Sequence, residues 1–337
     1  MNDTTLNEAE IQVLASLYKA NDENASSDRA SLEETGKRFW MFLEDWTDAY
    51  PSLLAKKLIE GDEDDYRLSE SGRSFGAHYH AERPDMYWYY YQKFYPTARA
   101  SEAHSRLCER VFGLDLTQEG QTDMAALHHL LQILDIKQGE NVLDLGCGAG
   151  VIVEYIAQKT GAEVTGLDYA ASAIEEAHHR TRTKNDKVSF VQGDLNALEL
   201  TEQSFDAVIS IDTLYWVNDL TKTMADIAKL LKPGGRMCIF MMDDVPEGRS
   251  AEGFSADETW LGQSLIELGI EFDAYDYTVQ HAAFWDRAYK AARDLKDEFE
   301  AEGNGFIPAS LIRESEEEFL PTIKAGNVAR YLYHVRW

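Results

Sequence analysis

The chain has 337 residues, of which 44% are hydrophobic and 11% aromatic, so it is long enough for about two folded domains and too apolar for a disordered protein. Its 60 acidic and 32 basic residues give a net charge of −28, which argues against nucleic acid or an anionic membrane as a partner. The polar start, the lack of a long apolar run and three scattered cysteines predict a cytoplasmic protein without a secretory signal, membrane span, disulfide framework or zinc site.

Residues 1–95 predict a helical N-terminal domain. Helices are expected over 6–20, 31–46 with Ser31 as its cap, 51–61 and 70–80, with a short strand between the last two. Three helices followed by a strand resemble a winged helix, which can bind DNA or serve as a dimerisation or lid domain. Because this region contains 19 acidic residues and only 10 basic ones, dimerisation or a lid is favoured over DNA binding.

From residue 122 to residue 337 the chain alternates apolar strands with amphipathic helices. This alternation predicts an α/β fold, a doubly wound parallel sheet that binds ligands at the carboxyl ends of its strands. The tail predicts a helix over 258–269, a strand over 272–278, a long helix over 282–303 and a final edge strand over 327–337. Residues 96–121, between the two domains, predict a lid-like segment.

The segment VLDLGCGAG (142–150) follows a predicted strand and opens a helix. Its glycines allow a tight turn and a close approach of the backbone to a ligand. Asp168 ends the next strand, where a carboxylate can accept hydrogen bonds from two ribose hydroxyls. Asp194 ends the third strand, placed for an adenine amino group, and LLKPGGRM (230–237) precedes the fifth. Taken alone, the glycine pattern also fits dinucleotide enzymes.

Together these segments resemble the class I S-adenosylmethionine-dependent methyltransferases over residues 120–245. This resemblance favours a methyltransferase over other Rossmann-like enzymes. The resemblance implies a seven-stranded Rossmann-like sheet and S-adenosyl-L-methionine as cofactor, with S-adenosyl-L-homocysteine as product and no metal. It also implies that residues 210–212 line the methyl site. The implied cofactor-binding residues are Asp144, Gly146, Cys147, Gly148, Gly150, Asp168, Tyr169, Gly193, Asp194, Leu195, Ser210 and Ile211.

The exit of the fourth strand, SIDTLYWVND, bears on the methyl acceptor. Methyltransferases that act on nucleobase or glutamine amino groups usually carry an Asn/Asp-Pro-Pro-aromatic motif there. This chain has Asp212 followed by Thr213, Leu214 and Tyr215, without proline, so it departs from that pattern. The apolar side chains up to Trp216 suit the pocket of a small-molecule acceptor instead.

The segment from Phe94 to Gly120 resembles the corresponding part of phosphoethanolamine and sarcosine/dimethylglycine N-methyltransferases. The resemblance outside the cofactor core is partial. Cys108 stands where the phosphobase enzymes have a tyrosine, and Trp216 where they have a histidine, so the dyad that orders their site is missing. A phosphate-contacting tyrosine after the fifth strand is also replaced, within FMMDD (240–244). We therefore do not predict phosphoethanolamine as the substrate.

Residues 87–96 hold seven aromatic side chains. Tyr87, Tyr90, Tyr91 and Phe94 have helical spacing, which predicts packing for most of the rings. Tyr91 and Tyr95 are expected over the methyl site because they precede the lid-like segment. Aromatic faces attract ammonium groups, so these rings and Trp216 suit an amine or a planar heteroaromatic acceptor.

The sequence therefore predicts a small-molecule methyltransferase, with N-methylation of an amine as the first hypothesis. Tyr95, His104 or Asp212 are the candidates to orient the acceptor or receive its proton, and Tyr91, Cys108, Tyr215 and Trp216 are the candidate pocket residues. One alternative is O- or C-methylation of a phenolic or polyketide-like metabolite. Another, of a different class, is a cofactor-sensing regulator that uses its winged helix. A homodimer through the N-terminal helices is also expected.

Overall fold

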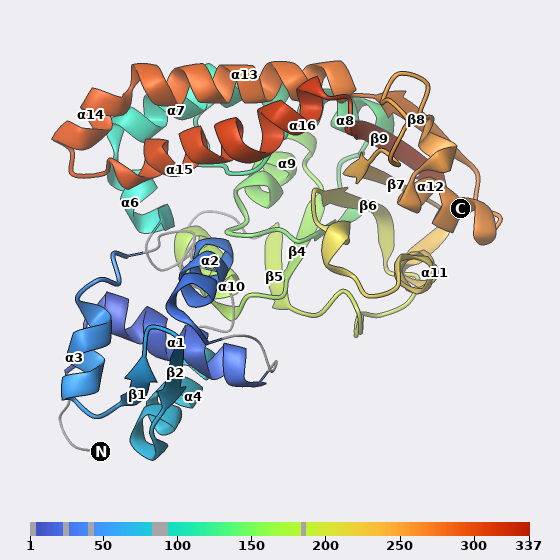
Figure 1. The fold of residues 1–337 in the computed structure, drawn as a ribbon. Coiled ribbons are helices and arrows are strands. Elements are labelled where there is room, and N and C mark those ends of the chain that lie inside the picture. Colours follow the sequence, from blue (N-terminus) through green and yellow to red (C-terminus); the bar gives the residue numbers. More distant parts are fainter. Residues whose placement is uncertain (1–4, 23–26, 40–43, 83–93, 183–186) are drawn as a thin grey trace. The chain divides into compact units, whose positions relative to one another are not determined.

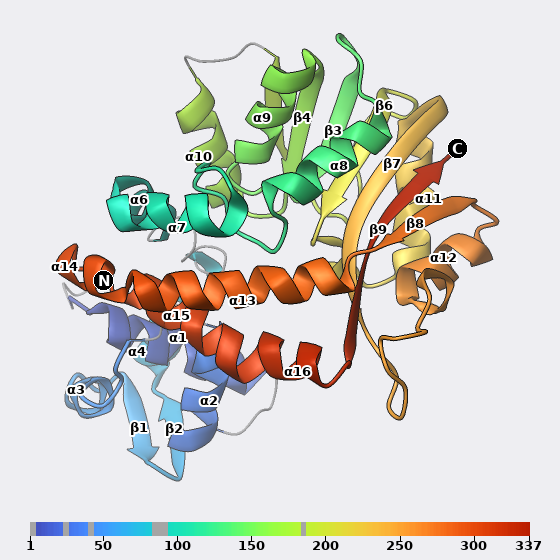
Figure 2. The same cartoon turned by 90° about the horizontal axis from the view of Figure 1, so that it is seen from above.

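The chain folds into two compact units, Met1–Tyr95 and Pro96–Trp337. The computed structural model describes residues 5–22, 27–39, 44–82, 94–182 and 187–337. Figures 1 and 2 show the arrangement of elements within each unit in two perpendicular views.

The first unit consists of helices around a small hairpin. Its elements are α1 (Glu8–Asp22), α2 (Arg29–Phe39), α3 (Ala49–Ala55), β1 (Ile59–Asp62), β2 (Asp65–Leu68) and α4 (Glu70–Glu82). Strands β1 and β2 pair antiparallel. Helix α1 packs against α2, α3 and α4, and its buried face carries Val13, Leu14 and Leu17.

Three details of this unit differ from the sequence predictions. Helix α2 begins at Arg29, and the carboxylate of Asp28 accepts from the backbone N–H of Ser31, so Asp28 rather than Ser31 caps it. Residues 44–46, predicted to be helical, lie outside any helix. Strand β1 lies where the end of a helix was predicted, because Lys57 adopts a left-handed φ of 57° that stops α3.

The second unit contains a seven-stranded sheet with helices on both faces. Its strands are β3 (Asn141–Leu145), β4 (Glu163–Asp168), β5 (Val188–Gln192), β6 (Phe205–Ile211), β7 (Leu231–Asp244), β8 (Phe272–Asp276) and β9 (Val328–Arg336). Its helices before residue 270 are α6 (Tyr95–Ala100, which begins at the boundary), α7 (Glu102–Phe112), α8 (Met124–Leu134), α9 (Val151–Thr160), α10 (Ala171–Thr181), η2 (Leu214–Trp216), α11 (Leu220–Leu230), η3 (Ala256–Glu258) and α12 (Trp260–Glu267). Its later helices are α13 (Thr278–Asp294), α14 (Lys296–Ala301), α15 (Phe306–Glu314), the π-helical turn η4 (Ser315–Phe319) and α16 (Leu320–Lys324).

The strands lie in the order β5-β4-β3-β6-β7-β9-β8. The first five run parallel, whereas β9 pairs antiparallel with both β7 and β8. The α/β fold with a mostly parallel sheet is the predicted one. The prediction that the last strand forms an edge is wrong, because β9 inserts between β7 and β8 and leaves β8 at the edge.

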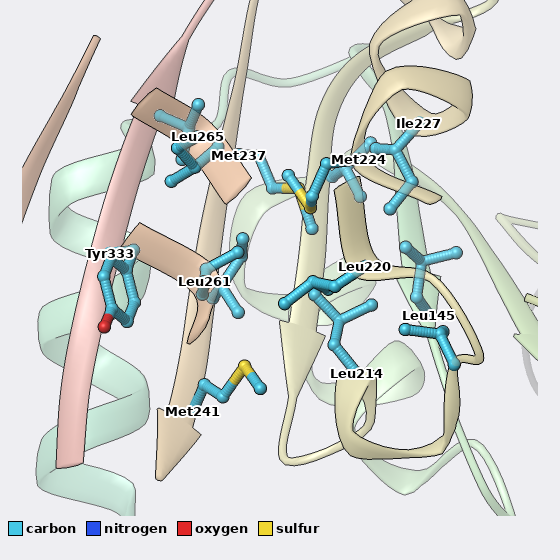
Figure 3. Close-up of a cluster of buried hydrophobic side chains, with 14 of the residues drawn as sticks. Leu145, Leu214, Leu220, Met224, Ile227, Met237, Met241, Leu261, Leu265 and Tyr333 are labelled. Carbon is cyan, nitrogen blue, oxygen red and sulfur yellow. The ribbon is translucent and has the colours of Figure 1, made fainter. Parts of the chain in front are cut away.

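The sheet separates two hydrophobic cores, because alternate residues of a strand point to opposite faces. Val142 packs with the side chains of α8, α9 and α10, whereas its neighbours Leu143 and Leu145 pack with those of α11 and α12. Figure 3 shows the second core, in which Leu220 of α11 and Leu261 of α12 gather near Met241 of β7. These cores hold the carboxyl ends of the parallel strands at one edge of the sheet.

The C-terminal helices form a further layer of the second unit. Helix α13 lies beside α7 and α15, as both views show. The long helix predicted over 282–303 is divided, since α13 ends at Asp294 and α14 begins at Lys296. The helical run from α15 through α16 was not predicted from the sequence.

Candidate functional site

Three glycines shape the turn between β3 and α9, at the carboxyl end of the parallel strands. Gly146, Gly148 and Gly150 all have left-handed φ values, of 75°, 54° and 74°. The backbone N–H of Gly146 donates to the carbonyl of Leu167 at 2.7 Å. A Cβ on Gly146 would lie 2.2 Å from Cγ2 of Thr213, so no other residue fits there without movement of the β6 exit.

Asp168, the last residue of β4, connects this glycine-rich turn to the next strand. Its Oδ2 accepts from the backbone N–H of Gly148 at 2.8 Å, and its Oδ1 accepts from that of Ala170 at 2.9 Å. The following residue, Tyr169, has 57% of its surface exposed. A carboxylate oxygen has two lone pairs, so Asp168 can still accept from ligand hydroxyls.

Asp144 lies beneath the turn and is buried. Burial and then the charge of Asp168 raise the pKa of the Asp144 carboxyl to about 7. A cation placed near these two carboxylates would favour the ionised form of Asp144. Cys147 is also buried, against Gly166, and burial raises the pKa of its thiol, so its side chain packs as a neutral group.

Arg180 of α10 braces the back of the same turn. Its Nη2 donates to the carbonyl of Ala149 at 3.0 Å, and its Nη1 pairs with Oε2 of Glu154 in the first turns of α9. Both side chains of this ion pair are nearly buried, at 13% and 10% exposure. The guanidinium therefore fixes the direction of a loop carbonyl, and with it the direction of the neighbouring N–H groups.

The loop after β5 is hydrogen-bonded to the end of β4. The backbone N–H of Gly193 donates to the carbonyl of Asp168 at 2.9 Å. Oδ1 of Asp194 accepts from both the backbone and the side-chain N–H groups of Asn196, at 2.8 and 2.9 Å. Leu195 is buried in the second core. The sequence-predicted residues 193–195 therefore lie on the loop after β5, and Gly193 ties this loop to the end of β4.

The exit of β6 combines an unpaired hydroxyl with a strained residue. Ser210 is fully buried, and among the residues that the structure describes its Oγ has no hydrogen-bond partner. Asp212 has a left-handed φ of 53°, which is unusual for a residue other than glycine. Ile211, between them, is partly buried. Such strain persists only where surrounding contacts enforce it.

Those contacts come from three side chains. Arg330 of β9 donates from Nη2 to Oδ2 of Asp212 at 2.5 Å, and Thr122 donates to the same oxygen at 3.3 Å. Tyr215 donates to Oδ1 at 3.0 Å, and its hydroxyl oxygen accepts from the backbone N–H of Met242 at 2.6 Å. Burial and the charge of Asp212 raise the pKa of Tyr215, which keeps its hydroxyl neutral. Trp216, one residue on, has 60% of its surface exposed.

A buried polar network continues from Arg330 into the C-terminal helices. Its Nη1 donates to the carbonyl of Gln121 at 3.1 Å. The side-chain oxygen of Gln121 lies 2.6 Å from Nε2 of His281 and accepts from Nε1 of Trp285 at 3.1 Å. Burial and the charge of Arg330 lower the pKa of His281 to about 3, so its ring is neutral.

The remaining sequence-predicted residues come earlier in the chain than the residues of this network. His104 is buried on α7, with Nδ1 3.6 Å from Sγ of Cys108 and Nε2 3.4 Å from Oε1 of Glu119. Burial raises the pKa of the Cys108 thiol. Tyr95 is buried and its ring meets that of Phe94 edge-on at 5.4 Å, but it belongs to the first unit. Tyr91 lies outside the described residues.

Over the described ranges, no cluster of three or more histidine, cysteine or carboxylate side chains could hold a metal ion. Within the same ranges, every helix is too short or too polar to cross a lipid bilayer.

Comparisons with known proteins decide the family. A family model described as a methyltransferase domain matches residues 136–293. The methyltransferase GfsG of Streptomyces halstedii is 37% identical over 209 residues, which cover 60% of this chain and 69% of that protein. The chain belongs to the S-adenosylmethionine-dependent methyltransferase family.

Other relatives resemble part of this methyltransferase. A phosphoethanolamine N-methyltransferase of Triticum aestivum is 29% identical over 194 residues, 57% of this chain but only 36% of that protein. The chain thus spans little more than a third of that relative. Among solved structures, phosphoethanolamine N-methyltransferase 2 of Haemonchus contortus has a TM-score of 0.58 at 20% identity, over 73% of this chain and 59% of that one. This likeness establishes the shared fold.

Sequence reasoning missed two residues of the candidate site, Arg180 and Arg330. Arg180 looked like one of several charges at the end of a helix, and only its contact with Ala149 distinguishes it. The long side chain of Arg330 is almost completely buried, at 2% exposure. A lone arginine in an apolar strand (VARYLYHV) was the available signal, because such a residue needs a buried partner.

Proposed function

We propose that this methyltransferase transfers the methyl group of S-adenosylmethionine to a small-molecule acceptor, with an amine nitrogen as the first candidate. The proposed cofactor site rests on one observation, the hydrogen bond from the backbone N–H of Gly148 to the carboxylate of Asp168. It places a carboxylate that can accept ribose hydroxyls beside a turn of left-handed glycines. The buried hydroxyl of Ser210, which has no partner among the described residues, and the exposed ring of Tyr169 also fit a ligand at this edge.

The residues would then share the binding of the cofactor. Gly146, Gly148 and Gly150 surround the amino-acid end, with Asp144 and Cys147 beneath them. Asp168 and Tyr169 hold the ribose, and residues 193–195 frame the adenine. Residues 210–212 line the methyl site. When bound, the cofactor supplies a methyl carbon that is electrophilic because it is attached to a positively charged sulfur.

The chain itself contributes alignment and exclusion of water rather than covalent chemistry. The acceptor's lone pair forms a bond to the methyl carbon while the carbon–sulfur bond breaks, and that electron pair stays on sulfur. The acceptor's proton leaves in the same overall reaction. The acceptor must therefore present an uncharged or anionic lone pair, in line with the bond that breaks.

Among the pocket candidates, Cys108, Tyr215 and Trp216 of the second unit support a small acceptor, whereas Tyr91 lies outside the described residues. A neutral thiol at position 108 and an exposed indole at position 216 are unlike the tyrosine and histidine of the phosphobase enzymes, which argues against phosphoethanolamine. The same apolar character supports the second candidate, O- or C-methylation of a phenolic or polyketide-like metabolite. Tyr95 and His104 stay proposals for orienting the acceptor.

We further propose that residues 1–95 form a winged-helix-like dimerisation or lid domain, with residues 96–121 as the lid-like segment, in a cytoplasmic homodimer. The acidic composition of the first unit supports this role over DNA binding. Binding of random duplex DNA in a gel shift at low salt would instead support the regulator hypothesis. Chromatography coupled to light scattering measures the oligomeric state.

The experiment that tests the function supplies methyl-labelled S-adenosylmethionine and a mixed extract of small metabolites, and detects labelled products by mass. Fragmentation of each product assigns the label to nitrogen, oxygen or carbon. Label on an amine nitrogen supports the first candidate, and label on oxygen or carbon supports the second. A protein that binds the cofactor but labels no metabolite would contradict both.

A further inference from the structure

The carboxylate of Asp212 is already occupied on both oxygens. Oδ2 accepts from Arg330 at 2.5 Å and from Thr122 at 3.3 Å, while Oδ1 accepts from Tyr215 at 3.0 Å. The side chains of Arg330 and Asp212 are only 2% and 11% exposed. Removal of either charge would leave the other buried without its counter-charge, which is strongly unfavourable.

Arg330 also joins segments that are distant in the chain. Besides Asp212, its guanidinium contacts the carbonyl of Gln121 and the hydroxyl of Thr122, both just before α8, and lies 5.3 Å from the centre of the Phe240 ring on β7. One cation from β9 therefore fixes the β6 exit relative to the end of the segment that leads into α8. It is also one of the three side chains that donate to Asp212 at its left-handed turn.

From these contacts we infer that Asp212 and Arg330 form a positioning pair that holds the methyl site in shape, and that Asp212 does not receive the acceptor's proton. The inference rests on the proposed function, since it assigns roles within that site. In the balanced reaction the new bond to carbon forms, the carbon–sulfur bond breaks, and the acceptor's proton passes to solvent water rather than to Asp212. A cationic acceptor would likewise find this carboxylate already neutralised.

Single and double variants that remove the charges of Asp212 and Arg330 test the pair. Asp212→Asn keeps a residue that tolerates left-handed φ but removes the negative charge. Arg330→Met removes the positive charge and keeps an apolar stem, and the double variant removes both. Arg336→Met is the matched control, because Arg336 lies on the same strand, is 55% exposed and pairs with the exposed Asp273 at 2.8 Å. Calorimetry measures S-adenosylmethionine affinity, and labelled transfer into a metabolite extract measures turnover.

We expect each single variant to weaken S-adenosylmethionine binding by about tenfold and the double variant to recover to within about threefold of wild type, because paired removal avoids an unpaired buried charge. Transfer should follow the same pattern, with Arg336→Met unchanged. If a single variant fails to fold, the double variant and Arg330→Lys still test the inference, because the first must bind and the second must lose less than Arg330→Met.

Two results would overturn the inference. In one, Asp212→Asn and the double variant bind the cofactor normally but both lose transfer, while Arg330→Met stays active, which would make Asp212 a proton acceptor. In the other, neither single variant changes binding or transfer. Failure of the proposed function looks different, since wild-type protein would then bind the cofactor and label nothing, and the binding cycle would still report on the pair.

Discussion

The carboxylate of Asp168 accepts a hydrogen bond from the backbone N–H of Gly148 at 2.8 Å. This contact fixes the glycine-rich turn after β3 relative to the end of the neighbouring parallel strand β4. The same two strands are in register, with Asp144 opposite Gly166 and Leu145 opposite Leu167. The proposed ribose and amino-acid contacts would therefore come from one rigid unit of two strands and two turns.

We expect a side chain at position 146 to abolish binding of the cofactor. In Gly146→Ala the new Cβ meets Thr213 at 2.2 to 2.8 Å at a left-handed φ, so we expect loss of measurable S-adenosylmethionine binding in calorimetry. Gly139→Ala is the matched control, because Gly139 has a φ of 81° but open space around it. The control should lose only about 1 kcal/mol of stability, from strain, and bind normally. Equal binding by both variants would refute the close approach.

Removal of the Arg180 brace should weaken cofactor binding without unfolding the protein. Arg180→Gln loses the ion pair with Oε2 of Glu154 and the contact with the Ala149 carbonyl, so we expect about a tenfold rise in the dissociation constant for S-adenosylmethionine, equal to about 1.4 kcal/mol. Arg182→Gln alters an exposed arginine two residues on and should change nothing. If both variants bind like wild type, the turn does not need the brace.

Asp144 should make stability fall as the pH rises from about 4 to about 7. Its folded-state pKa is about 7, raised by burial and by Asp168, whereas an unfolded chain titrates near 4. The folded state thus holds a proton that the unfolded state has lost, and its advantage declines through this range. Asp144→Asn should show a shallower decline in urea unfolding between pH 5 and 8.

Glu314 serves as the comparison for that experiment. Burial also raises its pKa to about 7, so it adds a decline of the same sign. Glu314→Gln should therefore remove a separate part of the slope, and the double variant should be the least sensitive to pH. A slope that survives unchanged in Asp144→Asn would show that this carboxyl titrates normally in the folded protein.

Loss of the Tyr215 hydroxyl should reduce stability. In Tyr215→Phe the partly buried N–H of Met242 loses its acceptor and Asp212 loses a donor, which we expect to cost about 1–3 kcal/mol in the free energy of unfolding. Tyr289→Phe removes a surface hydroxyl that contacts Glu316 and should cost less than about 0.5 kcal/mol. Denaturant titrations of both variants compare the two losses, and equal losses would contradict the buried role of Tyr215.

The parallel half of the sheet could be predicted from the sequence because its signals are local. Apolar strands such as NVLDL and FDAVISI alternate with amphipathic helices, and a glycine run or an aspartate follows each strand end. The carboxyl ends of parallel strands meet at one edge, so Gly146, Asp168 and Asp194 could be placed together before the fold was known.

The antiparallel end of the sheet and its contacts could not be predicted in this way. Insertion of β9 between β7 and β8 depends on pairing between residues about ninety positions apart, such as Phe240 with Leu332, which no local pattern encodes. The pair of Asp212 and Arg330 depends on the same insertion. Helices α15 and α16 were missed because the acidic stretch around Glu316 and the prolines Pro308 and Pro321 hide their apolar spacing.

We propose that Asp168 and the glycine-rich turn hold the S-adenosylmethionine whose methyl group is transferred. The most direct test compares wild type with Asp168→Ala for incorporation of labelled methyl groups into a metabolite extract, with mass detection. We predict a labelled product from wild type and none above background from Asp168→Ala, because the variant loses both the ribose contact and the hold on Gly148. Equal labelling by the two proteins, or no product from wild type that binds the cofactor, would contradict the account.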